Sequence, residues 1–233
     1  MTTIFPSDAH PDRIQVWLDF DGTITQYDVL DALILRYSES NAWREVELLW
    51  EQGKIGSRAC LTREFEFLRI DEPTLRRVLD NITLDPGAVR LLGLLQAHQV
   101  PMMVVSDGID WFIRRILAAH GFGHLPVRAN RAVHTGDRLT FSCPHHNPEC
   151  SADAAHCKCA SVRRFAQSGR CGVYIGDGRS DVCAARRMPI RFAKNVLARQ
   201  LRAENLPYIA FQTLHDVADQ LVAVWGEAQV LVA

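Results

Sequence analysis

The chain has 233 residues, which is enough for one large α/β domain or for a core domain with a small inserted one, and two unrelated domains would be a tight fit. Its 26 Lys and Arg residues nearly balance its 27 Asp and Glu residues, which excludes a strong overall field for nucleic acid or an acidic membrane surface. Hydrophobic residues make up 48% of the sequence, as is typical of a globular protein, so disorder is expected only within the first ten residues.

The first residues do not resemble a secretory signal, because Asp, His and Pro stand where a basic start and an apolar run are needed. No later segment is long and apolar enough to cross a membrane. The seven cysteines are an odd number in a chain without such a signal, which favours free thiols or metal ligands over disulfides. We therefore expect a cytoplasmic protein that binds neither nucleic acid nor membranes, and the sequence leaves its oligomeric state open.

The first predicted strand covers residues 14–18 and ends on the segment Asp19–Thr23, where Asp and Gly break the strand. From residue 28 to about residue 80 the apolar residues change to helical spacing. This pattern predicts a compact insertion of four helices directly after the first strand.

Predicted helices and strands then alternate along the rest of the chain. They are a helix at 86–98, a strand at 100–105, a helix at 111–120, a strand at 172–175, a helix from 180 and a strand at 190–193. Between them, residues 127–134 and 138–143 flank a turn and predict a β-hairpin. The alternation predicts an α/β fold, a doubly wound parallel sheet with helices on both faces.

Polar and acidic residues follow three of the predicted strands, in the segments Asp19–Thr23, Ser106–Gly108 and Gly176–Asp181. In open α/β sheets the carboxyl ends of the strands meet at one edge, where ligands bind, so these segments are expected to converge there. Several carboxylates close together would raise one another's pKa unless a cation lay among them. Oxygen ligands select a hard cation, so the sequence predicts a Mg²⁺ site with Asp19 and Asp177 as direct ligands.

The first two aspartates suit a two-step phosphoryl transfer. A carboxylate such as Asp19 can attack phosphorus and form an aspartyl-phosphate, which divides one difficult displacement into two easier ones. Asp21 lies two residues along an extended chain and on the same side of it, where it can protonate the leaving oxygen and later deprotonate the attacking water.

A phosphate group also requires hydrogen-bond donors and a positive charge. We expect the donors in two segments, from Thr23 with the backbone near Gly22, and from Ser106, Asp107 and Gly108. Lys158 is one of only three lysines and precedes a predicted helix, so it is expected to supply the charge. The alternative for Lys158 is an ordinary exposed lysine whose flanking cysteines matter instead.

Taken in order, these motifs resemble the four motifs of the haloacid dehalogenase-like phosphatase superfamily, and they extend from Asp19 to Asp181. The resemblance implies a set of roles: nucleophile for Asp19, general acid and base for Asp21, phosphate-binding hydroxyl for Ser106, positioning lysine for Lys158, and metal-side acids for Asp177 and Asp181. It also implies that Asp21 contributes its backbone carbonyl to the Mg²⁺ site. Whether Asp181 is a direct ligand or acts from behind one stays open at this point.

The same resemblance implies a domain organisation. Residues 1–27 and 81–233 would form the catalytic core, and residues 28–80 a mobile helical cap that closes over the substrate. A cap in this position, with a Cys/His-rich segment before the third-motif lysine, is similar to the methionine-salvage phosphatases that act on 2-hydroxy-3-keto-5-methylthiopentenyl 1-phosphate. Phosphoserine phosphatases and phosphoethanolamine/phosphocholine phosphatases share some of these features and are the alternatives for the small-molecule substrate.

Three cap residues bear on this choice. In phosphoserine phosphatases, which are similar through the first motif, a cap acid and a cap arginine read the amine and the carboxylate of the substrate. Asp28 occupies roughly the place of the acid, but Glu64 falls where the arginine should be, with Arg63 one step away. We therefore expect Asp28, Arg63 and Glu64 to influence specificity, and the alternative for Asp28 is a helix N-cap.

The Cys/His-rich segment allows a second metal. Its four cysteines are Cys143, Cys150, Cys157 and Cys159, and they can supply soft ligands for a structural Zn²⁺. Their spacings are irregular for a standard zinc site. The alternative is a reduced loop whose cysteines pack against the protein or contact the substrate.

Two other classes of function remain. One is a phosphate-binding protein that has kept the fold without turnover, and the other is a related hydrolase that cleaves carbon–halogen or carbon–phosphorus bonds. Asp21 separates both from a phosphatase. A binding-only descendant need not keep both acids, and by resemblance the other hydrolase branches lack the second aspartate.

Overall fold

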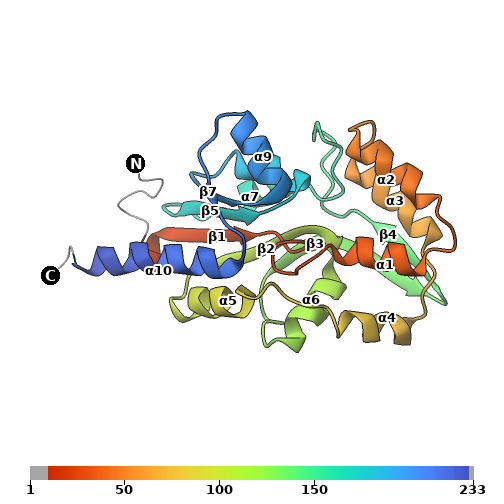
Figure 1. The fold of residues 1–233 in the computed structure, drawn as a ribbon, viewed down its shortest axis with the longest axis horizontal. Helices are drawn as coiled ribbons and strands as arrows, with labels where there is room; N and C mark the ends of the chain where they lie inside the picture. The colour runs from red at the N-terminus through yellow and green to blue at the C-terminus, as the bar shows by residue number, and fades with distance from the viewer. Residues whose placement is uncertain (1–9, 231–233) are drawn as a thin grey trace. The chain divides into compact units, whose positions relative to one another are not determined.

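The computed structural model of the chain describes residues 10–230 (Figure 1). The chain divides into two compact units, each assembled from separate stretches of sequence. The first unit contains the residues up to Gln26, Leu84–Val104 and the residues from Lys158 onward, and the second contains Tyr27–Thr83 and Val105–Cys157. The expected disorder near the N-terminus concerns positions that lie, apart from His10, outside the described residues.

The first unit is built on parallel strands and the helices that cover them. Its elements are the 3-10 helix η1 (Pro11–Arg13), β1 (Ile14–Leu18), α5 (Ala88–Ala97), α7 (Lys158–Phe165), β5 (Cys171–Gly176), the 3-10 helix η2 (Arg179–Asp181), α8 (Val182–Ala185), β6 (Ile190–Ala193), α9 (Asn195–Ala203), β7 (Ile209–Ala210) and α10 (Leu214–Val230). All five residues of β1 are buried, as expected for a parallel strand covered on both faces. Helices α5 and α10 lie side by side along this sheet (Figure 1).

The second unit combines the four predicted cap helices with a hairpin. Its elements are α1 (Val29–Tyr37), α2 (Trp43–Glu51), α3 (Ser57–Phe67), α4 (Glu72–Leu79), α6 (Asp110–Ala119), β3 (Val127–Thr135) and β4 (Arg138–Ser142). Strand β2 (Met102–Ile109) begins in the first unit and ends in the second. The predicted hairpin is present, and Gly136 takes the positive φ of 66° that its tight turn requires.

The strands follow the order β4-β3-β2-β1-β5-β6-β7. Strand β1 pairs in parallel with β2 and β5, and β5, β6 and β7 continue in parallel, whereas β3 and β4 are antiparallel. This mostly parallel sheet with flanking helices confirms the predicted fold class. The predicted division into a core and a cap stays a prediction, because contacts group Val105–Cys157 with the helical insertion.

Two predicted boundaries are wrong. Strand β2 does not end at Val105 but continues through Ser106 and Asp107 to Ile109, because the buried Ile109 extends the apolar pattern beyond the turn-like residues. The helix expected from Ser180 is divided into η2 and the short α8. Helix α9, strand β7 and helix α10 follow the last predicted strand, where the sequence analysis makes no prediction.

Candidate active site

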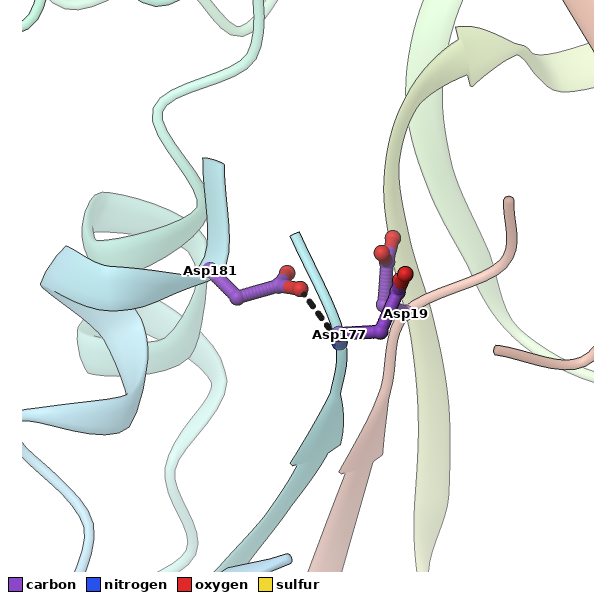
Figure 2. Close-up of side chains that lie close together, drawn as sticks. All are labelled: Asp19, Asp177 and Asp181. Atoms are coloured by element: carbon purple, nitrogen blue, oxygen red, sulfur yellow. Dashed lines mark hydrogen bonds between the residues drawn. The ribbon is translucent and has the colours of Figure 1, made fainter. Parts of the chain in front are cut away.

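Two aspartates that follow strands and one that ends a 3-10 helix converge in the first unit (Figure 2). Asp19 follows β1, and its backbone N–H donates to Ile175 O of β5 at 2.9 Å, which continues the ladder between the two strands. Asp177 follows β5, and Asp181 ends the 3-10 helix η2. Ligand oxygens of Asp19, Asp177 and Asp181 all lie within 4.8 Å of one another. The predicted convergence of the first and last motifs at the carboxyl edge is therefore present in the structure.

Lys158 joins two of these carboxylates. It is the first residue of α7, and its side chain is fully buried. The Lys158 Nζ donates to Asp19 Oδ1 at 2.6 Å and to Asp181 Oδ1 at 2.7 Å. Charge-assisted hydrogen bonds of this length are among the strong ones in proteins, so Lys158 holds Asp19 in a defined orientation. The alternative of an ordinary exposed lysine is wrong.

Asp181 is engaged on both of its oxygens. Oδ1 accepts the Tyr174 hydroxyl at 2.7 Å in addition to Lys158. Oδ2 accepts the backbone N–H of Asp177 at 3.0 Å (Figure 2) and that of Gly178 at 2.9 Å. Because both oxygens of Asp181 already accept hydrogen bonds from four donors, we expect Asp181 to hold Lys158 and the Asp177 backbone in place and not to bind a metal directly. Tyr174 was not predicted from the sequence, because a buried tyrosine within a strand carries no sequence signal of such a contact.

Asp177 is held from two other elements. Its Oδ1 accepts the Thr23 hydroxyl at 3.1 Å, and its Oδ2 accepts the Asn195 side-chain amide at 3.2 Å. Gly22 has a φ of 71°, and a Cβ at this position would lie 2.8 Å from Asp177 Oδ2. The glycine in the first motif therefore allows both the turn and the close approach of the fourth motif. Asn195 was not predicted as a site residue from the sequence. It adopts a positive φ of 48°, which asparagine tolerates better than most residues.

The pKa values of the two carboxyl groups at the strand ends are raised. Burial is the largest cause for Asp19, followed by the negative charge of Asp181, while the Lys158 ammonium lowers its pKa. Burial also raises the pKa of Asp177, again with Asp181 as the next cause, while the amide of Asn195 opposes the shift. Neither Lys158 at Asp19 nor Lys194 at Asp177 fully offsets the burial and the charge repulsion that raise these pKa values.

A divalent cation fits this arrangement. Three carboxylates and one ammonium leave a formal charge of minus two, and the donors that converge are all oxygens. Hard cations such as Mg²⁺ select oxygen ligands and are bound through one or two carboxylates. Because Asp181 is occupied by four donors, Asp19 and Asp177 are the carboxylates best suited to contact a cation directly.

Asp21 lies in the turn that follows β1 and is partly exposed. The backbone N–H groups of Thr23 and Ile24 both bond to Phe20 O, which closes this turn around Asp21 and Gly22. The first unit thus brings together Asp19, Thr23, Lys158, Asp177 and Asp181, with Asp21 two residues beyond Asp19.

The remaining predicted phosphate-binding residues lie in the second unit, on the last part of β2. Ser106 is buried, and its Oγ accepts the Gly108 N–H at 2.8 Å. The Asp107 carboxylate accepts hydrogen bonds from Ser57 and from the backbone of His156.

The three predicted specificity residues also lie in the second unit. Asp28 is the N-cap of α1, where its Oδ1 accepts the N–H groups of Leu30 at 2.8 Å and Asp31 at 3.1 Å. Arg63 is exposed on α3, whereas Glu64 is buried on the same helix. Burial raises the Glu64 pKa to about 7, and the negative charge of Asp28 adds to the shift.

The cysteines of the proposed zinc segment are separated by the unit boundary. Cys143, Cys150 and Cys157 belong to the second unit and Cys159 to α7. All seven cysteines lie in the described part of the chain, and none of them forms a disulfide there. Within residues 10–230 the acidic trio is the group of three or more metal-type ligands that converges, and it contains no cysteine. Burial raises the pKa of Cys143 to about 11, and no converging group among the described residues supports the zinc prediction.

A family model described as haloacid dehalogenase-like hydrolase matches residues 16–186, which is most of the chain. The chain therefore belongs to this family, and the predicted family is confirmed. It is 27% identical to a 2-hydroxy-3-keto-5-methylthiopentenyl-1-phosphate phosphatase of Brevibacillus brevis, over 92% of this chain and 98% of that relative. A protein of the same description from an Exiguobacterium strain is also 27% identical, over 88% of this chain and 96% of the relative.

Solved structures are similar in fold. A substrate-bound phosphoserine phosphatase superposes with a TM-score of 0.69 at 17% identity and covers 89% of this chain and 98% of its own. A HAD family hydrolase from Salmonella enterica serovar Typhi superposes with a TM-score of 0.70 at 19% identity, covering 91% of this chain and 72% of its own. At these identities the likeness establishes the shared fold.

In the described residues no helix has the length and apolar character needed to span a membrane.

Proposed function

We propose that this chain is a Mg²⁺-dependent phosphomonoesterase that acts on a small-molecule phosphate ester through an aspartyl-phosphate on Asp19. The observation that carries the proposal is the buried Lys158 ammonium, which contacts both Asp19 and Asp181. This contact joins the first, third and fourth motifs at one strand edge, as an attack by a carboxylate on phosphorus requires. Membership of a hydrolase family and relatives described as phosphatases support it.

In the proposed first step an Asp19 oxygen attacks phosphorus while the ester oxygen leaves. Lys158 keeps Asp19 oriented and offsets its negative charge. Mg²⁺, held by Asp19, Asp177 and the backbone carbonyl of Asp21, would supply the further positive charge that an anionic substrate requires. Asp21 protonates the leaving oxygen, and in the second step it takes a proton from the water that hydrolyses the aspartyl-phosphate. Thr23, Ser106 and Gly108 remain our predicted phosphate-binding residues.

For the substrate we propose 2-hydroxy-3-keto-5-methylthiopentenyl 1-phosphate. The relatives that cover nearly the whole chain carry this substrate in their descriptions. Beyond its phosphate the molecule bears no charge, so it needs no cationic partner in the cap. Phosphoserine carries a carboxylate that would need such a partner, and the cap offers the buried acid Glu64 where an arginine is expected. Asp28, Arg63 and Glu64 remain predicted specificity residues, and a cytoplasmic location remains a prediction.

A substrate panel tests the proposal. We expect kcat/KM for the enol phosphate to exceed that for phosphoserine and phosphoethanolamine by at least about tenfold, with Mg²⁺ present. Phosphate release should be measured for each ester under identical conditions. A preference for phosphoserine would contradict the substrate but keep the chemistry, whereas no hydrolysis of any ester would contradict both.

The metal can be tested without turnover. If Asp19 and Asp177 bind Mg²⁺ in the folded state, Mg²⁺ at a hundred times its Kd should raise the free energy of unfolding by about 2.7 kcal/mol. Asp177→Asn should reduce this gain, and Asp219→Asn, an exposed carboxylate paired with Arg90, is the matched control. EDTA should also abolish phosphate release and Mg²⁺ should restore it. Full activity after exhaustive chelation would contradict the metal.

The role of Asp21 separates a phosphatase from the alternatives. Asp21→Asn should lower kcat for an alkyl phosphate by about 10²–10⁴-fold, because it removes the leaving-group proton donor. Nitrophenyl phosphate has a leaving group that needs no proton, so the fall in kcat that Asp21→Asn causes should be smaller for this substrate. Equal losses for the two substrates would count against the acid role.

A further inference from the structure

The carboxylate of Asp107 connects two segments that are distant in sequence. Its Oδ2 accepts the Ser57 hydroxyl, at the first residue of α3, at 2.7 Å. Its Oδ1 accepts the backbone N–H of His156 at 2.6 Å. All three residues belong to the second unit. Both carboxylate oxygens are therefore bonded to protein donors, and a negative group so placed suits support of the chain better than direct contact with a phosphate anion.

Ser57 extends this connection to a second backbone amide. Its Oγ accepts the N–H of Ala155 at 3.0 Å while its own proton goes to Asp107. Two consecutive backbone N–H groups, those of Ala155 and His156, are thus held by one serine and one aspartate. Ala155 and His156 are both buried, and Ser57 and Asp107 are half-buried.

The backbone of the strand that bears Asp107 is held by two further side chains. The buried side chain of Asn130, on β3, donates its amide to Asp107 O at 2.6 Å. The His156 ring is buried as well, and its Nδ1 lies 2.9 Å from Ser106 O. The strand that bears Asp107 and the segment that ends at His156 are therefore linked through backbone and side chain.

The N-terminus of α3 lies close to the same segment. A Cβ at Gly56 would be 2.3 Å from Asp153 O and 2.6 Å from Ala152 O, so only glycine permits this approach. The next residue after Ser57 is Arg58, whose side chain pairs with Asp153 at 2.8 Å. The beginning of α3 is thus attached to the four residues Ala152–Ala155 at several points.

This segment leads directly into Lys158. His156 stands two residues before Lys158, which begins α7 and contacts Asp19 and Asp181. A displacement of the 155–156 backbone would move the start of α7, and an error of about 1 Å in a reacting group can cost about 10²-fold in rate.

From these contacts we propose that Asp107, together with Ser57, is a positioning residue for Lys158. The two side chains hold the 155–156 backbone, which leads within two residues into Lys158 at the start of α7. The proposal depends on the proposed phosphatase function for its kinetic consequence. The fixed 155–156 backbone depends only on contacts within the second unit. The proposal assigns Asp107 a different role from the phosphate contact that its place beside Ser106 predicts.

The kinetic test is a graded series in the full-length protein. Asp107→Ala removes both acceptors and should lower kcat by about 100-fold, with KM changed far less, because the substrate still binds while the reacting groups are misplaced. Ser57→Ala should give a smaller loss of the same kind. Asp107→Asn keeps one carbonyl acceptor for His156 and an amide that can donate to Ser57 Oγ, so it should recover most of the lost kcat.

A matched control and a second measurement complete the design. Asp110→Asn changes a neighbouring carboxylate that pairs with Arg114 on α6, and it should leave kcat unchanged. Hydrogen exchange should be followed in a peptide that contains residues 154–158. Its amides should exchange faster in Asp107→Ala and Ser57→Ala than in the wild type, because each of these variants frees a bonded N–H. In Asp110→Asn the exchange rate of the peptide should not change.

Three results would overturn the proposal: wild-type kcat in Asp107→Ala, a raised KM with unchanged kcat, or unchanged exchange at residues 154–158. If Asp107→Ala does not fold, Ser57→Ala gives the same decision, since it removes one hydroxyl from a partly exposed position. If the wild type hydrolyses no phosphate ester, the proposed function fails, and the exchange measurement alone decides whether Asp107 holds the segment.

Discussion

Asp19 in the first unit and Glu64 in the second are both carboxyl groups with only 4% exposure, and burial is the largest cause that raises the pKa of each. Their neighbours differ. Asp19 has the Lys158 ammonium at 2.6 Å, whereas the groups that shift the Glu64 pKa are Cys60, Glu47 and Asp28, none of which is a cation. Burial raises the pKa of both carboxyl groups, but only at Asp19 does a cation, the Lys158 ammonium, oppose the shift. Asp19 lies among carboxylates that suit a further cation, whereas Glu64 keeps a proton up to a pH of about 7.

Of the substitutions that test this difference between Asp19 and Glu64, Asp19→Asn should have the largest effect. Asp19→Asn should lower kcat by on the order of 10⁴-fold, because an amide is a poor nucleophile and a weaker metal ligand. Phosphate release under saturating substrate measures it. Asp85→Asn is the control, since Asp85 is also buried in the first unit but bonds to the backbone of Gly87 and Leu214. Activity of Asp19→Asn within tenfold of the wild type would refute Asp19 as the nucleophile.

Removal of Lys158 should leave Asp19, like Glu64, buried without a neighbouring cation. Lys158→Met leaves Asp19 and Asp181 without their cation and should lower the free energy of unfolding by about 3–5 kcal/mol in EDTA, as measured by urea denaturation. Lys54→Met, at an exposed lysine, should change it by less than about 0.5 kcal/mol. If the double variant Lys158→Met with Asp181→Asn were as unstable as Lys158→Met alone, charge would not be the reason for the loss.

Glu64 should make the stability of the chain depend on pH. Its pKa is raised from 4.5 to about 7 in the folded state, so between these values the folded chain keeps a proton that the unfolded chain has lost. Stability should therefore fall as the pH rises through this window, by about 3 kcal/mol at most, and the loss should be complete above pH 7.

Glu64→Gln tests this directly, because glutamine has the same shape and does not titrate. The difference in unfolding free energy between the variant and the wild type should shift in favour of the variant between pH 5 and pH 8. Glu66→Gln, on the exposed side of α3, should produce no such shift. A pH-independent difference for Glu64→Gln would mean that Glu64 is ionised in the folded state despite its burial.

The smallest expected effect is at Asp28, which lies close enough to Glu64 to raise its pKa. Asp28→Ala removes the N-cap of α1 and should cost about 1 kcal/mol of stability, whereas Asp28→Asn keeps a capping oxygen and should cost less. Because both variants remove the negative charge, both should lower the pH at which Glu64 titrates. A loss for Asp28→Asn as large as for Asp28→Ala would contradict the capping role.

Much of this molecule could be predicted from local sequence pattern. The buried strand Ile14–Leu18 reads as an unbroken apolar run, the four cap helices follow helical spacing, and the Gly136 turn marks the hairpin. The convergence of Asp19 with Asp177 also followed, because strand ends in a parallel sheet meet at one edge whatever the loops between them. These features depend on repeats of two to four residues or on a general property of the fold.

The tertiary structure decided which partner each polar group has. Lys158 and Asp19 are 139 positions apart, and the Tyr174 hydroxyl, the Asn195 amide and the Ser57 hydroxyl carry no sequence signal of the carboxylates that they contact. From the sequence, Asp107 is predicted to be part of a phosphate-binding motif. In the structure its two carboxylate oxygens accept hydrogen bonds from the Ser57 hydroxyl and the His156 backbone N–H. A hydrogen bond acts over about 3 Å and requires alignment, so small shifts of packed elements select among many possible partners. Periodicity predicts which elements form, and only their packing determines which side chains meet.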